Sequence, residues 1–161
     1  MGRTLAAVLA LTATIAAQGA YDKLLTIADV EKVAGMTGVR TVPNGSQAGA
    51  GGMLNFARGD GKLILMVNFG DAQLYRKARD TKEIEIGGKK YPNMLFAHDV
   101  PGLGDEAFAS PPGRDQFAIY ARKGSKAITV STYYPGVGEG VKPVLTEAQL
   151  KAIAQLIFSR E

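Results

Sequence analysis

The chain has 161 residues and no cysteine. The absence of cysteine excludes disulfides, a thiol nucleophile and thiolate metal sites. It also excludes the lipid anchor of bacterial lipoproteins, which is attached to a cysteine at the processing site. The fold must therefore be stabilised by core packing alone.

The chain is also poor in histidine, and His98 is the only one. A single histidine excludes a metal site built on a His pair and leaves no spare base for a Ser-His-Asp triad. No G-x-S-x-G nucleophile elbow is present, and the spacing of the 15 acidic residues singles out no catalytic pair. We therefore expect a protein that is not an enzyme and needs no cofactor.

One alternative stays open around the single histidine. Asp99, Asp105 and Glu106 follow His98 closely, and such a carboxylate-rich loop could bind a hard cation such as calcium. Their spacing differs from that of an EF-hand. The alternative hypothesis is a hydrolytic or metal-dependent enzyme with its site near His98–Glu106.

Positive charge is modest and scattered. Nineteen Lys and Arg residues against 15 Asp and Glu residues give a formal charge of +4, to which Arg3 contributes one. This excess is too small to indicate a nucleic-acid partner.

The N-terminus is typical of a secretory signal peptide. Arg3 precedes an uncharged, mostly apolar run from Leu5 to Ala17, and Ala17 and Gly19 supply small residues before a cleavage point. Cleavage before Ala20 predicts a signal peptide over 1–19, a single domain over 20–161 and a periplasmic or secreted location. The run is short for a bilayer about 30 Å thick, so we expect membrane attachment only if the segment is uncleaved.

Capping residues predict three helices. Thr26 precedes one helix that ends at Gly35, and Thr146 with Gln149 forms a capping box for the last helix. Asp71 is expected to cap a third, which runs to about residue 79. The inward positions expected on the last two helices are Leu74, Tyr75, Ala78, Leu150, Ile153, Ala154 and Ile157.

Alternating segments predict β-structure, and one hairpin is repeated. Residues 56–69 form two apolar arms around a Gly-Asp-Gly turn, and residues 120–133 align with them without gaps. A smaller hairpin is expected over 83–91, around Gly87-Gly88. The fold predicted is α+β: an antiparallel sheet with helices packed on one face, built from two related halves.

The repeat also predicts a functional face. Alternation directs Ile128, Val130, Thr132 and Tyr134 toward the helices, and Thr129, Ser131 and Tyr133 away from them. The ungapped alignment then places Leu63, Leu65, Val67 and Phe69 on that same open face, which would be an unusually large apolar patch. We expect a small ligand, a protein partner such as a second subunit in a homodimer, or the loop at 43–52 to cover it. The alternative is that strand 63–69 is buried on both sides.

A family resemblance accompanies these elements. The segment Pro101-Gly102-Leu103-Gly104-Asp105-Glu106-Ala107-Phe108 and the hairpin at 117–133 are similar to the DUF3558-type secreted lipoproteins of actinobacteria. The chain lacks the lipid-bearing cysteine of that family, so the resemblance implies no membrane tether, and the family supplies no catalytic residues. The function expected is an exported, non-catalytic binding or interaction module.

Overall fold

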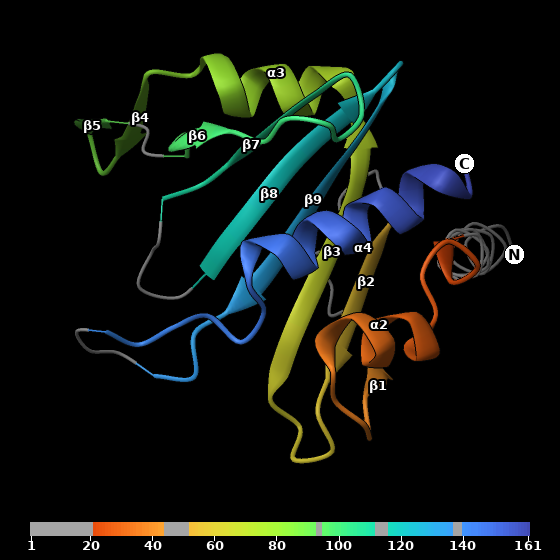
Figure 1. The fold of residues 1–161 in the computed structure, drawn as a ribbon. Coiled ribbons are helices and arrows are strands. Elements are labelled where there is room, and N and C mark those ends of the chain that lie inside the picture. The colour runs from red at the N-terminus through yellow and green to blue at the C-terminus, as the bar shows by residue number, and fades with distance from the viewer. Residues whose placement is uncertain (1–20, 44–51, 93–94, 112–115, 137–139) are drawn as a thin grey trace, which may run out of the picture.

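A seven-stranded antiparallel sheet forms the body of the protein. The computed structural model describes residues 21–43, 52–92, 95–111, 116–136 and 140–161, and the predicted signal peptide over 1–19 lies outside them. The strand order is β1-β2-β3-β9-β8-β7-β6, and β4 pairs with β5 in a separate hairpin (Figure 1). This arrangement confirms the α+β prediction with an antiparallel sheet.

The bounds of the elements are as follows. The helices are α2 (Ile27–Ala34), α3 (Ala72–Asp80) and α4 (Glu147–Ser159). The strands are β1 (Arg40–Val42), β2 (Met53–Ala57), β3 (Leu63–Asp71), β4 (Glu83–Ile86), β5 (Lys89–Pro92), β6 (His98–Asp99), β7 (Glu106–Ala109), β8 (Gln116–Lys123) and β9 (Lys126–Tyr133). Within the described ranges, no helix is both long and apolar enough to cross a membrane.

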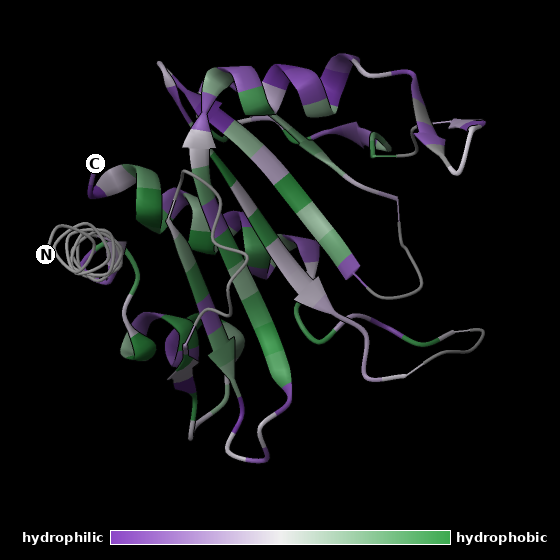
Figure 2. Ribbon diagram, turned by 180° about the vertical axis from the view of Figure 1, so that it is seen from behind, coloured by the Kyte–Doolittle hydropathy of each residue, from purple (hydrophilic) through white to green (hydrophobic). Residues whose placement is uncertain are grey.

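Helices α2 and α4 cover one face of the sheet. Helix α4 crosses in front of the strands in Figure 1 and lies behind them in Figure 2. Its apolar stripe, Leu150, Ile153, Ala154 and Ile157, is fully buried, as predicted. Burying a large aliphatic side chain contributes about 1.5–3 kcal/mol to the free energy of folding. The three large side chains of this stripe therefore stabilise the packing of α4 on the sheet.

Capping boxes fix where α2 and α4 begin. Thr26 accepts a hydrogen bond from the Asp29 backbone N–H in α2, and Thr146 accepts one from Gln149 in α4. In both boxes the side chain of the third helical residue also bonds back to the backbone N–H of the cap. Helix α2 ends at Gly35, whose φ of 66° suits glycine. The capping predictions for both helices are confirmed.

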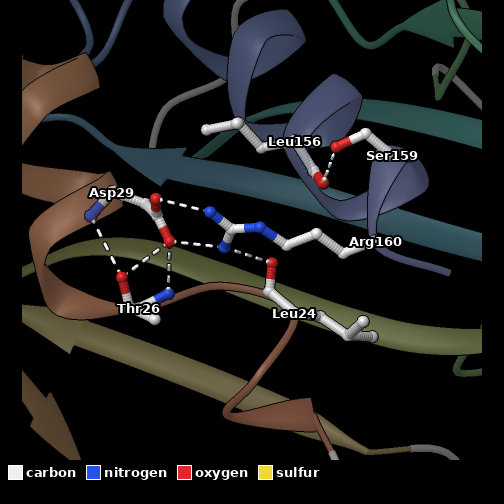
Figure 3. Close-up of polar contacts among 6 residues, drawn as sticks. All are labelled: Leu24, Thr26, Asp29, Leu156, Ser159 and Arg160. Atoms are coloured by element: carbon white, nitrogen blue, oxygen red, sulfur yellow. Dashed lines mark hydrogen bonds and ion pairs between the residues drawn. The ribbon is translucent and has the colours of Figure 1, made fainter.

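An ion pair ties the start of α2 to the end of α4. The Arg160 guanidinium donates from Nη1 and Nη2 to the two carboxylate oxygens of Asp29, over 2.6 and 2.8 Å (Figure 3). Arg160 Nη1 also donates to the Leu24 carbonyl over 3.2 Å. These hydrogen bonds hold the pKa of Asp29 well below its usual range, with the bond from Arg160 as the largest cause.

The third helix lies on the opposite face, contrary to the prediction that all helices share one face. Along β7, Ala107 and Ala109 belong to the core under α2 and α4, whereas Phe108 packs in a separate cluster with Tyr75 of α3. Successive residues of a strand point to opposite faces, so α3 must lie behind the sheet. The sequence predicted the Asp71 cap correctly but carries no local signal for the face that α3 covers.

A β-bulge interrupts the pairing of β2 with β3. Phe56 pairs with Leu65 and Ala57 with Leu63, so the register shifts there and Ile64 has no cross-strand partner. The Ile64 carbonyl instead accepts a hydrogen bond from Thr132 Oγ1 over 2.7 Å. Beyond a bulge, the alternation of side chains between the two faces is shifted by one residue.

The two-halves prediction stays a prediction. In the sheet order, β1-β2-β3 and β7-β8-β9 are arranged symmetrically about the β3–β9 pair. The helices that follow the two hairpins nevertheless lie on opposite faces of the sheet.

Candidate functional site

The seven residues predicted to share an open face lie on both faces of the sheet. Leu65, Val67 and Phe69 are buried in the core under α2 and α4. Their partners across the β3–β9 pair are Thr132, Val130 and Ile128, which are the residues predicted to face the helices. The prediction that Leu65, Val67 and Phe69 form an exposed patch is therefore wrong.

The β-bulge at Ile64 explains the error. The ungapped alignment carries the alternation of β9 onto β3 unchanged, but the bulge shifts β3 by one residue. A shift of one residue moves every following side chain to the other face. Leu63, which precedes the bulge, pairs with Ala57 and is half-buried.

The other three predicted residues, Thr129, Ser131 and Tyr133, lie on the face opposite α2 and α4, as predicted. Thr129 pairs with Asn68 of β3, and Ser131 pairs with Met66. Figure 2 views the sheet from this side. The side chains that the bulge brings beside Thr129 and Ser131 are therefore Asn68 and Met66, in place of Leu65 and Val67.

These residues form the floor of a groove that we call the trough. It has a volume of about 950 Å³, at the upper end of the range for small-molecule sites. Its floor comprises Met53 of β2, Met66 and Asn68 of β3, Thr129 and Ser131 of β9, and Gln116 and Tyr120 of β8.

The floor mixes polar and apolar side chains and carries no formal charge. Its hydrogen-bonding groups are two carboxamides, two aliphatic hydroxyls and the Tyr120 phenol, and thioether side chains lie between them. Burial raises the pKa of Tyr120, and it does the same for Tyr133 at the edge of this face. Both phenols therefore stay neutral at physiological pH, and the Tyr133 hydroxyl lies 3.7 Å from Met66 Sδ.

Helix α3 and the N-terminal segment make the walls. Leu74 and Lys77 line the trough from α3, and Leu95 lines it from the segment before β6. Leu74 was predicted to point inward but is 53% exposed, because α3 covers one end of the sheet and leaves the trough open beside it. On the other side Tyr21 stacks on Phe69, with ring centroids 4.1 Å apart.

Sequence reasoning missed five floor residues, Met53, Met66, Asn68, Gln116 and Tyr120. Asn68 carried a usable signal, because it is the one strongly polar residue between Leu63 and Phe69. If Asn68 had been assigned to the exposed face, the period of two would have placed Val67 and Phe69 in the core. The ungapped alignment of the two hairpins assigned Asn68 to the opposite face, against the indication of its polarity.

A second groove runs between α3 and residues 99–107, with a volume of about 730 Å³. Most of its charged groups are paired with one another, and Arg76 and Asp80 also line it. Arg79 Nη2 lies 3.0 Å from Asp99 Oδ1, and Arg122 lies 3.2 and 3.4 Å from the carboxylates of Asp105 and Glu106. We call this the charged groove.

The acidic residues near His98 do not gather around it. His98 Nε2 lies 3.1 Å from Glu147 at the start of α4, whereas its neighbour Asp99 pairs with Arg79 of α3 behind the sheet. Among the described residues, no three His, Asp or Glu side chains are placed to hold one metal ion. His98 and Asp99 therefore point to opposite faces of the sheet.

Comparison with protein-family models, with curated proteins and with solved structures found no match. The resemblance of Pro101–Phe108 and of 117–133 to the DUF3558-type lipoproteins stays a prediction.

Proposed function

We propose that the protein is an exported, non-catalytic binding module that holds an uncharged ligand in the trough. One observation supports the proposal most directly. A face of the central sheet carries the uncharged hydrogen-bonding side chains of Asn68, Gln116 and Thr129, and the buried Ser131, among methionine and tyrosine. Apolar linings with a few polar groups that fix orientation are typical of small-molecule sites.

The charged groove is a weaker candidate because most of its charges already pair with one another. An ionic ligand there would have to replace the Asp99–Arg79 pair or the pairs of Arg122 with Asp105 and Glu106. Because the three carboxylates are at least half exposed, replacing such a pair costs an ionic ligand about 0–1 kcal/mol. No comparable rearrangement is needed for an uncharged ligand in the trough.

Methyl NMR of methionine offers a direct test. Met53 and Met66 lie on the trough floor, whereas Met36 packs against the core beside α2 on the other face. With the methionine ε-methyl groups labelled with carbon-13, the full-length protein is screened against neutral, anionic and cationic small molecules. We expect neutral compounds to shift the Met53 and Met66 signals and to leave Met36 unchanged.

The opposite pattern contradicts the proposal. If only charged compounds bind, and they shift backbone amides around Arg79 while Met53 and Met66 stay unchanged, the charged groove is the binding site. If none of the compounds shifts Met53 or Met66, the trough is not a ligand site.

A further inference from the structure

The hydrogen-bonding groups of the trough floor share one property. The carboxamides of Asn68 and Gln116 and the hydroxyls of Thr129 and Ser131 can each both donate and accept. The hydroxyl groups of a ligand have the same dual character. A peptide backbone does not, because its N–H only donates and its C=O only accepts.

Apolar groups are interleaved with these polar ones. Met53 lies opposite Asn68, and Met66 lies opposite Ser131. Tyr120 lies opposite Thr129 on the next strand pair. A sugar ring presents C–H groups on its faces and hydroxyls around its edge, so it can contact both kinds of side chain together.

Formal charge is confined to the walls of the trough. Asp71 and Lys77 line it from the start and the middle of α3. The Asp71 carboxylate already accepts hydrogen bonds from the backbone N–H groups of Gln73 and Leu74, at 2.9 and 3.0 Å. A charged ligand could therefore pair only with these wall residues, and its charge would lose hydration on a floor that offers no opposite charge.

The trough is long as well as uncharged. Its floor crosses β2, β3, β9 and β8, which are successive neighbours in the sheet. At an inter-strand spacing of about 4.8 Å, these four strands span about 14 Å. This length exceeds a single sugar ring and fits a short chain of them.

We infer that the ligand of the trough is a neutral oligosaccharide. The inference rests on the proposed function, because it names the chemical class that the same site would bind. A charged glycan matches the floor less well, because the floor itself carries no opposite charge. A peptide, whose N–H and C=O groups the same side chains can bond, is the alternative that the test below distinguishes.

The test uses named probes and matched variants of the full-length protein. The probes are maltotriose, cellotriose and chitotriose as neutral sugars, and N-acetyl-trialanine amide as a neutral peptide. Binding is followed through the Met53 and Met66 methyl signals, with Met36 as internal control. Thr129→Val removes a hydroxyl from the trough floor, and Thr41→Val makes the same change at an exposed position of β1.

We expect at least one trisaccharide to bind and to shift both floor methionines. Thr129→Val should raise its Kd by roughly threefold to tenfold, which corresponds to the loss of one hydrogen bond, and Thr41→Val should leave Kd unchanged. Asn68→Leu, which removes a second floor group, should raise Kd at least as much. Both trough variants should retain the wild-type amide spectrum of α2 and α4.

Two results would overturn the inference and differ in what they say of the proposed function. If the peptide shifts Met53 and Met66 and the sugars do not, the trough binds ligands but the class is wrong. If neither the sugars, the peptide nor the small-molecule screen shifts these methyls, the binding function itself fails.

Discussion

Thr132 links three parts of the core through a single buried hydroxyl. It donates to the Ile64 carbonyl at the bulge and accepts from the Leu145 backbone N–H before α4, over 2.7 and 3.2 Å. Thr132→Val keeps the shape but leaves both backbone groups without this partner. We expect a loss of about 1–3 kcal/mol in the free energy of unfolding, measured by urea denaturation.

Thr129→Val serves as the control at the residue scale. It lies on the same strand but on the open face, so its loss of unfolding free energy should stay below about 0.5 kcal/mol. Equal losses for the two variants would contradict the role assigned to Thr132.

The Asp29–Arg160 pair predicts a pH dependence. Because the pKa of Asp29 is lowered in the folded state, chiefly by the Arg160 hydrogen bond, its stabilising effect is complete above the unfolded value of about 3.9. That effect is lost as pH falls from there toward the folded pKa. Asp29→Asn should therefore destabilise the protein by about 1 kcal/mol at pH 7 and by less at pH 3, as measured by urea denaturation. A difference that does not change with pH would rule out this account.

Gly104 permits a close approach of the loop before β7 to strand β8. Its φ is +62°, and an added Cβ would clash with the Arg122 carbonyl oxygen. The neighbouring Asp105 backbone N–H donates to that same carbonyl over 2.8 Å. Gly104→Ala should therefore lower the free energy of unfolding by at least about 1 kcal/mol, whereas Gly136→Ala, where a Cβ meets open space, should be close to neutral.

At the scale of elements, the success of sequence reasoning depended on how local each signal is. The caps of α2, α3 and α4 were predicted correctly because a cap and its bonded N–H groups lie within four residues of one another. The Gly87-Gly88 hairpin was predicted for the same reason, and both glycines have positive φ. The face covered by α3 and the shift at Ile64 depend on contacts with distant strands, so neither could be predicted locally.

The candidate site shows the same division. Thr129, Ser131 and Tyr133 were assigned to the correct face because β9 pairs with β3 and β8 without a register shift. Leu65, Val67 and Phe69 were assigned to the wrong face because the bulge in β3 has no counterpart in β9. A single unpaired residue thus places Asn68 and Met66 on the face where an apolar patch was expected.

The β4–β5 hairpin should be the least stable element among those described. It forms its own two-stranded sheet, and its strand β5 is exposed throughout. An isolated hairpin of this size is marginal in water. Hydrogen exchange should therefore be fastest in 83–92 and slowest in β3 and β9 at the centre of the sheet. Comparable protection of the hairpin and β3 would show that the hairpin packs on another surface in solution.

At the scale of the whole molecule, the sheet leaves less apolar surface for a homodimer interface than the sequence predicted. The homodimer prediction rested on a patch of Leu63, Leu65, Val67 and Phe69, of which the last three are at most 5% exposed within one chain and Leu63 is half-buried. The driving force expected for self-association is therefore absent from that face. We expect light scattering to give the mass of a monomer at micromolar concentration, and a stable dimer would contradict this expectation.

Intermolecular nuclear Overhauser effects would test the central claim, binding in the trough, most directly. With methyl-labelled methionine in the full-length protein and a neutral trisaccharide in excess, we predict effects between sugar protons and the Met53 and Met66 methyls. None should reach Met36, on the other side of the sheet. Effects confined to Met36, or to residues of the charged groove such as Arg79, would contradict the account and place the ligand elsewhere.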